Sequence, residues 1–130
     1  MIRDAKESDR QAIEEMFLTS HLPENCRPDL ASPLFIIKKV VDENGKAVQV
    51  GAVRITAEVF LLVDHDSGTP EKRMSNLKEL SEEMAREAWQ KGLDDVTAWI
   101  PPEIEKSFGK RLKEIGFQRS PWPSYSRILT

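Results

Sequence analysis

Apolar residues recur every three or four positions in three stretches of the chain, and this spacing predicts amphipathic helices. The stretches are residues 7–20, 70–92 and 103–116. Their apolar faces consist of Ile13, Met16 and Phe17 in the first, Leu77, Leu80, Met84, Ala85 and Ala88 in the second, and Ile104, Phe108, Leu112 and Ile115 in the third. Ser8 or Asp9 is a suitable N-cap for the first helix. The second and third stretches end on Gly92 and Gly116, and glycine favours the left-handed conformation that ends a helix.

Other segments predict strands, because they are rich in β-branched and aromatic residues. They are residues 1–5, 34–41, 47–56, 57–64, 94–100 and 117–129. Asn44-Gly45, between the second and third of these, is the strongest short signal for a hairpin. The unbroken apolar run of residues 59–63 indicates a strand that is buried on both faces. Residues 21–33 carry three prolines, so they are expected to form a loop with at most a short helical turn.

The order of elements is strand, helix, loop, three strands, helix, strand, helix and strand. The first strands are joined by a hairpin and are expected to be antiparallel, whereas the later strand-helix-strand unit should be a right-handed parallel crossover. The sequence therefore predicts an α+β fold, with a mixed, mostly antiparallel sheet and helices on both faces. With 130 residues and neither a repeat nor a linker, the chain suits a single domain over residues 1–130.

Composition narrows the class of protein. The sequence is 39% hydrophobic and 32% charged with a net charge of −3, which is typical of a soluble globular protein and gives no overall reason to expect nucleic acid as a partner. No apolar run approaches the roughly 20 residues that span a bilayer, and the charged start lacks the apolar core of a signal peptide. We therefore expect a cytoplasmic protein with no membrane partner. Cys26 is the only cysteine, so no cysteine metal cluster exists, and no metal site is predicted.

Several segments resemble the GCN5-related N-acetyltransferase (GNAT) family, and the resemblance covers nearly the whole chain. They are IRDAKESDRQAIEEM at the start, and FLLVD, LKELSEEMAREAWQKGLDDVTAWI and GKRLKEIGF later. The resemblance implies a GNAT-like acyl-CoA N-acyltransferase fold. It also implies transfer of an acetyl group from acetyl-CoA to a small-molecule or peptide amine. Sheets of this family often pair, so a homodimer is a further expectation.

In that family, the end of the strand and the turn before the long helix bind the pyrophosphate of acetyl-CoA. The corresponding positions here are Leu62 and Val63 at the strand end and Lys72, Arg73, Met74, Ser75 and Asn76 in the turn and helix. His65 directly follows the strand end, on the side of the sheet where ligands are expected, and its alternative is a surface histidine of the turn. Small residues let the backbone come close to the phosphates. The negative phosphates then interact favourably with the N–H groups at the positive N-terminus of the helix. This sequence departs from the motif, because Ser75 and Leu77, or Asn76 and Lys78, stand where the family has small residues. The alternative is that Thr69 and Pro70 simply cap the helix.

The family's catalytic positions are also altered. Leu112 stands where a tyrosine acid is frequent, and Glu105 stands where an asparagine is often found. The candidates that remain are Glu58, at a strand position where some members carry a glutamate base, and Tyr125, the only tyrosine. Each has a structural alternative, as a solvent-facing strand residue and as a half-buried tyrosine respectively. Trp89, Trp99 and Trp122 are expected in the core or covering the sheet. The alternative for Trp122, which lies between Pro121 and Pro123, is a rigid wall of the acceptor site.

A basic cluster lies near the C-terminus, formed by Lys106, Lys110, Arg111, Lys113 and Arg119. A solvated helix face explains it, and a contact to the 3′-phosphate of coenzyme A is the alternative. RNA is not favoured, because no aromatic residues are interleaved with the basic ones. Two functions follow for the chain. The first is an N-acetyltransferase, in which acetyl-CoA is the co-substrate. The second is a GNAT-fold binding or regulatory protein without turnover, which the altered motifs favour.

Overall fold

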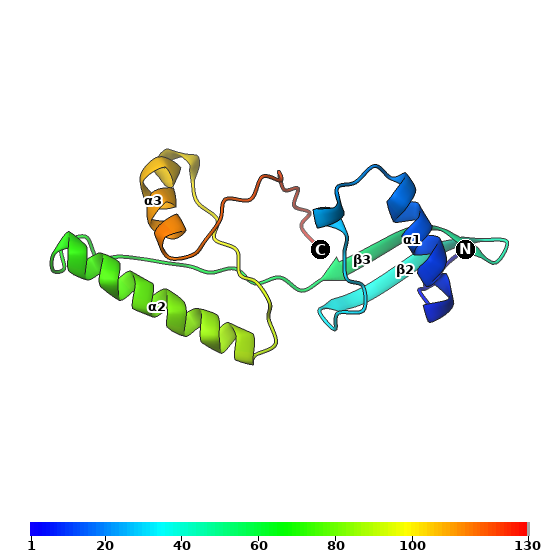
Figure 1. Cartoon of the computed structure of the whole chain (residues 1–130), viewed down its shortest axis with the longest axis horizontal. Helices are drawn as coiled ribbons and strands as arrows, with labels where there is room; N and C mark the ends of the chain where they lie inside the picture. The colour runs from blue at the N-terminus through cyan, green and yellow to red at the C-terminus, as the bar shows by residue number, and fades with distance from the viewer. Residues whose placement is uncertain (130) are drawn as a thin grey trace. The chain divides into compact units, whose positions relative to one another are not determined.

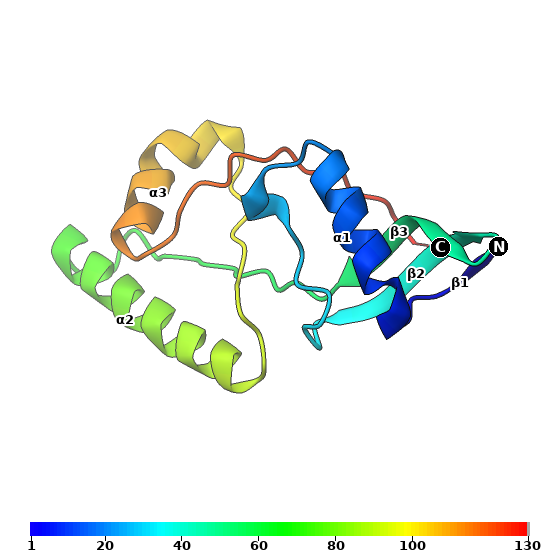
Figure 2. The same cartoon turned by 45° about the vertical axis from the view of Figure 1, so that its right-hand side comes forward.

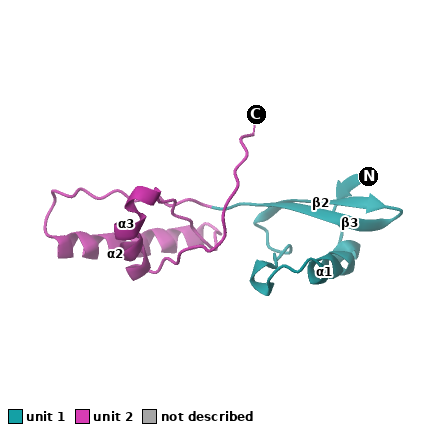
Figure 3. Ribbon diagram, turned by 90° about the horizontal axis from the view of Figure 1, so that it is seen from above, with its two compact units in different colours: residues 1–56 teal, residues 57–130 magenta. Residues whose placement is uncertain are grey.

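The computed structural model describes residues 1–129 and shows an α+β protein (Figure 1). The chain forms two compact units, Met1–Thr56 and Ala57–Thr130, which Figure 3 shows in teal and magenta. The predicted α+β class is confirmed, whereas the single domain over residues 1–130 and the GNAT-like arrangement stay predictions.

The first unit contains a three-stranded antiparallel sheet. Its strands are β1 (Ile2–Asp4), β2 (Phe35–Glu43) and β3 (Lys46–Arg54), in the spatial order β1-β2-β3. The predicted hairpin between β2 and β3 is confirmed. Its two turn residues have positive φ, 55° at Asn44 and 85° at Gly45, which is the combination of a type I′ turn. The N–H of Gly45 donates to Oδ1 of Asp42 at 2.8 Å, which closes the turn from the side.

One helix accompanies this sheet. A 3₁₀ turn, η1 (Glu7–Asp9), leads into α1 (Arg10–Thr19), which lies along one face of the hairpin (Figure 2). Asp9 occupies the N-cap position of α1, as expected, but its side chain makes no cap bond there. It accepts the N–H of Lys6 instead, at the start of η1. The proline-rich loop contains the expected short turn, η2 (Glu24–Cys26), and Val40 and Ala47 form the buried centre of this unit.

The second unit contains two helices, α2 (Pro70–Gln90) and α3 (Pro102–Glu114). Gly92 and Gly116 follow them with φ of 90° and 99°, which confirms both predicted ends. Leu77 of α2 and Leu112 of α3 are buried, as the periodicity predicts. The rest of the α2 face differs from expectation, because Leu80 is 47% exposed and Ser81 is buried in its place.

Residues 57–64 and 94–100, which were expected to form two parallel strands, run side by side but share only one bridge. A single parallel bridge joins Glu58 to Thr97, with Val59 N–H donating to Thr97 O and Thr97 N–H to Ala57 O, both at 2.9 Å. The predicted parallel direction is therefore confirmed, but continuous strands over residues 57–64 and 94–100 are not formed. In Figures 1 and 2 the segment before α2 passes between α2 and α3.

Burial of residues 57–64 alternates along the segment. Ala57, Val59, Leu61 and Val63 are half-buried, and the residues between them are exposed. Phe60 and Leu62 are 82% and 81% exposed, so the expected burial on both faces is wrong. Only the face that carries the odd-numbered side chains is partly covered, so the segment resembles a strand with its other face open to solvent.

The last segment also differs from expectation. Residues 117–129 form no strand, in keeping with Pro121 and Pro123, which cannot donate to a sheet ladder. The expected burial of Trp89, Trp99 and Trp122 is wrong as well, because all three indole side chains are exposed.

Candidate functional site

The turn before α2 is closed by its own atoms. Oδ1 of Asp64 accepts the N–H of Asp66 at 3.0 Å, and the carbonyl of Asp64 accepts the N–H of Ser67 at 3.2 Å. Gly68 follows with φ of 64°, a conformation that disfavours larger residues. The turn therefore holds its shape without a ligand.

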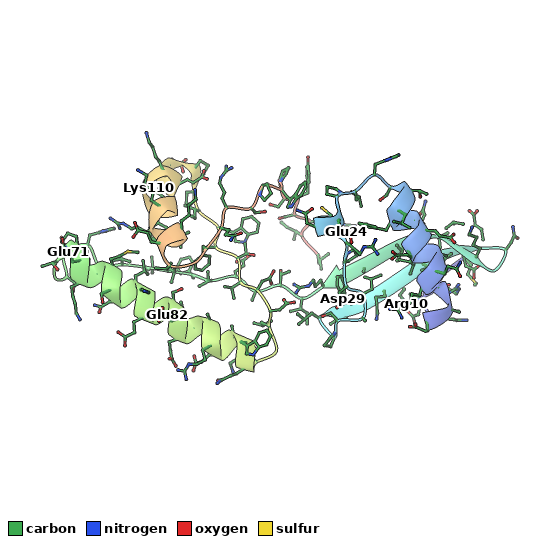
Figure 4. All side chains as sticks on the ribbon, viewed as in Figure 1. Arg10, Glu24, Asp29, Glu71, Glu82 and Lys110 are labelled. Atoms are coloured by element: carbon green, nitrogen blue, oxygen red, sulfur yellow. The ribbon has the colours of Figure 1, made fainter. Side chains whose placement is uncertain are left out.

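The start of α2 is capped by Thr69, as the alternative interpretation of the sequence predicts. Oγ1 of Thr69 accepts the N–H of Lys72 at 3.1 Å, and its carbonyl accepts the N–H of Arg73 at 2.9 Å. Pro70, in the first helical position, has no N–H to satisfy. Among residues 1–129, the one first-turn N–H without a described partner is that of Glu71, which Figure 4 labels.

The two cations of the first turn are in different situations. Nη1 of Arg73 donates to the carbonyls of Ser67 and Gly68, at 3.1 and 2.9 Å, so its charge stabilises the turn. Lys72 is exposed, and no partner for its ammonium is described within residues 1–129. A cation at the positive end of a helix is unfavourable unless an anion joins it. Lys72 is thus the residue of this turn that is left to meet an anion.

The other predicted pyrophosphate contacts lie further along α2. Because the helix begins at Pro70, the residues Met74, Ser75 and Asn76 lie within its body. Their N–H groups bond to carbonyls four residues earlier, so they are used by the helix. An anion could meet their side chains but not their backbone donors. His65 is exposed in the turn.

The backbone just before the turn is open instead. No hydrogen bond within residues 1–129 is described for the N–H or C=O groups of Phe60 to Val63, and this range includes the predicted contacts Leu62 and Val63. The segment is extended, as its alternating burial indicates. It therefore offers strand-like donors and acceptors to an extended ligand that carries amide groups.

The two catalytic candidates are not joined. Glu58 is exposed beside the bridge to Thr97, and Tyr125 is 97% exposed in the terminal segment. No contact between them, or from Tyr125 to the turn, is described within residues 1–129. Leu112 is buried in α3, so it serves the core at the position where the family often has an acid.

Two of the cavities within residues 1–129 lie outside this turn, one in each unit. The first, about 450 Å³, lies between the start of α1, the loop after η2 and β2. Its charged lining is largely paired internally: Arg27 binds Glu14, and Nζ of Lys38 donates to the carbonyl of Leu30. Figure 4 labels two more of its lining residues, Arg10 and Asp29.

The second cavity, about 390 Å³, lies beside α2 and is lined by Ser81. Sequence reasoning missed this residue. The available signal was its spacing, four positions after Leu77 and seven before Ala88, which places a hydroxyl on the apolar face of the helix.

Comparison with models of known protein families, with curated proteins and with solved structures finds no match to this chain. Within residues 1–129, no helix is both long and apolar enough to cross a membrane. The same residues contain no group of three or more His, Cys, Asp or Glu side chains that could hold a metal ion.

Proposed function

We propose that this chain is a GNAT-like, cytoplasmic N-acetyltransferase that takes an acetyl group from acetyl-CoA and gives it to a small-molecule or peptide amine. The observation that carries the proposal is the unpaired, extended backbone of Phe60 to Val63 directly before α2. The pantetheine arm of coenzyme A is long and narrow and carries two amides. Such an arm can pair with a free strand edge as an added strand does.

The turn supplies the second part of the proposal. Lys72 and the N–H of Glu71 are positive groups at the start of α2 without described partners within residues 1–129. The pyrophosphate of acetyl-CoA would bind there, at the positive end of the helix. A glycine-rich turn would offer more N–H donors to the pyrophosphate. The binding of acetyl-CoA would therefore depend more on Lys72 and on the backbone edge.

Catalysis would depend mainly on holding the two reactants together. The amine nitrogen attacks the thioester carbonyl, an amide bond forms and the carbon–sulfur bond breaks. Glu58, exposed beside the backbone edge, would take the amine proton through water. The thiolate of coenzyme A leaves and takes a proton from solvent, so no fixed acid is required.

A second candidate function is binding or regulation without turnover. It is favoured by the self-closed turn, because Thr69 accepts the N–H of Lys72 and Arg73 donates to two carbonyls, so these donors are not left for a phosphate. The buried Leu112 favours it too, because the usual acid is replaced by a core residue. Acetyl-CoA would then bind as a ligand that is not consumed.

The first experiment is calorimetric titration of the full chain with acetyl-CoA. Two variants test the two parts of the proposal. Leu62→Pro removes one N–H from the backbone edge, and Leu62→Ala is its control because it keeps that N–H. Lys72→Ala removes the free cation, and Lys78→Ala is its control because Lys78 is an exposed lysine on the same helix.

We expect binding to the wild type and to both controls, with clear weakening in Leu62→Pro and Lys72→Ala. No heat with acetyl-CoA in large excess would rule out the transferase. Binding that is followed by thiol release in a screen of amines supports transfer. Binding without thiol release for any amine supports the second function.

A further inference from the structure

The cavity beside α2 has a mainly apolar lining without charged residues. It is lined by Val59, Val96, Met84 and Phe117, with polar groups only at Ser81 and Gln118 among the side chains that shape it. None of its lining residues carries a charge. Its volume of about 390 Å³ falls within the range of small-molecule sites, roughly 300–1,000 Å³. One water takes up only roughly 30 Å³, so a single ordered water does not fill it.

Ser81 gives this cavity a chemical preference. The residue is only 9% exposed, yet no hydrogen bond to its hydroxyl is described within residues 1–129. A serine inside a helix usually donates to a carbonyl one turn earlier, as Thr19 does in α1 by donating to the carbonyl of Glu15. Ser81 makes no such bond. The hydroxyl itself is not enclosed, so it can donate to an acceptor on a ligand that enters the cavity.

We propose that this cavity is a binding site for a neutral, mainly apolar small molecule that presents one acceptor, such as a carbonyl oxygen, to Ser81. The uncharged lining offers no partner to a phosphate, a carboxylate or an ammonium group, so a ligand with a charge inside the cavity is disfavoured. The apolar side chains bind the body of the ligand, and the hydroxyl fixes its orientation. The proposal is independent of acetyl transfer, because the cavity does not include Phe60 to Val63 or the turn.

The test uses acetophenone, a neutral aromatic ketone, and ethylbenzene, which has a similar shape but no oxygen. Nitrogen-15 NMR spectra of the full chain are recorded during titration with each compound. We expect saturable shifts at the amides of Val59, Val96 and Phe117, which line the cavity. Acetophenone should bind about five- to tenfold more tightly than ethylbenzene, the effect of one hydrogen bond.

Three variants locate the site. Ser81→Ala should weaken acetophenone to the level of ethylbenzene and leave ethylbenzene unchanged. Ser75→Ala, an exposed serine on the same helix, is the control and should change neither. Ala85→Leu fills the cavity and should remove binding of both compounds. The spectrum of each variant reports directly whether it is folded, and Ser81→Ala is expected to fold because it breaks no described bond.

The proposal is overturned by shifts that do not saturate or that lie away from the cavity. It is also overturned if Ser81→Ala binds acetophenone as tightly as the wild type, because the hydroxyl then recognises nothing.

Discussion

The guanidinium of Arg3 binds the carboxylate of Asp9 through two parallel hydrogen bonds, Nη1 to Oδ2 and Nη2 to Oδ1, each at 2.8 Å. The same side chain donates from Nε to Oδ2 of Asp42, also at 2.8 Å. One residue of β1 therefore ties together the turn before α1 and the end of β2. Arginine suits this role because its planar fork matches a carboxylate in two places.

Both carboxylates also accept backbone groups. The hydrogen bonds from Arg3 and then from the N–H of Lys6 hold the pKa of Asp9 well below its usual range. The hydrogen bond from Arg3, helped by the N–H of Gly45, lowers the pKa of Asp42. Each bond favours the ionised form, so protonation of either residue weakens the first unit.

The first prediction concerns acid stability. Because the pKa of Asp9 is lower in the folded than in the unfolded chain, the unfolded chain binds more protons in acid, and stability falls with pH. The contribution is complete well above the unfolded pKa of about 3.9, and it is lost as the pH falls from about 5 toward the lower pKa of the folded chain. Urea unfolding at several pH values should show Asp9→Asn less stable than the wild type near neutrality and less sensitive to acid.

Asp66→Asn is the control for this measurement. The Asp66 carboxylate is exposed in the turn before α2, and no ion pair or hydrogen bond to it is described within residues 1–129. Its acid profile should follow the wild type. If Asp9→Asn and the wild type lose stability in parallel below pH 5, the link between Arg3 and Asp9 does not govern acid unfolding.

The second prediction concerns the hairpin. Gly45 has φ of 85°, whereas Gly51 in β3 has no positive φ, and an added Cβ would meet nothing within 4 Å at either position. Gly45→Ala should therefore lower the free energy of unfolding by about 1–2 kcal/mol through backbone strain alone. Gly51→Ala, the control, should be neutral or slightly stabilising because alanine fits a strand at least as well as glycine. Equal losses in thermal unfolding would contradict a type I′ turn.

The sequence correctly predicted the turns and helix ends that depend on one or two neighbouring residues. Asn44-Gly45 set the hairpin, Gly92 and Gly116 set two helix ends, and Thr69 with Pro70 set a helix start. In each case the backbone preference of one or two residues decides the local structure, so no distant contact is needed.

Sequence was less successful where burial depends on neighbours. The apolar run around Phe60 predicts a strand that is buried on both faces. In the structure only the face formed by Val59 and Leu61 is partly buried, and the face that carries Phe60 is exposed. Composition cannot show whether both faces of a strand are covered by the rest of the protein. The phosphate contacts at Ser75 and Asn76 depended on where α2 begins, and a start at Pro70 places them inside the helix. The hydroxyl of Ser81 was missed because a single serine in a helix usually has a local partner.

The third prediction concerns the cap of α2. Thr69→Ala removes the acceptor for the N–H of Lys72 and should cost about 1 kcal/mol of stability. Thr69→Ser keeps an oxygen in reach and should recover most of this loss. Thermal or urea unfolding of the two variants measures the difference. A Thr69→Ala variant as stable as the wild type would show that the hydrogen bond contributes nothing to the helix.

The last prediction separates the two cations that follow this cap. Arg73→Ala removes the bonds to the carbonyls of Ser67 and Gly68, and should lower the free energy of unfolding by about 1 kcal/mol. Lys72→Ala removes a cation without a described partner from the positive end of α2, and should leave stability unchanged or raise it by about 0.3 kcal/mol.

Urea unfolding in low salt measures both, since screening weakens the helix-end effect. Lys78→Ala, further along α2, is the control and should change little. If Lys72→Ala destabilises as much as Arg73→Ala in the absence of any ligand, Lys72 has a structural partner. It would then not be free to bind an anion.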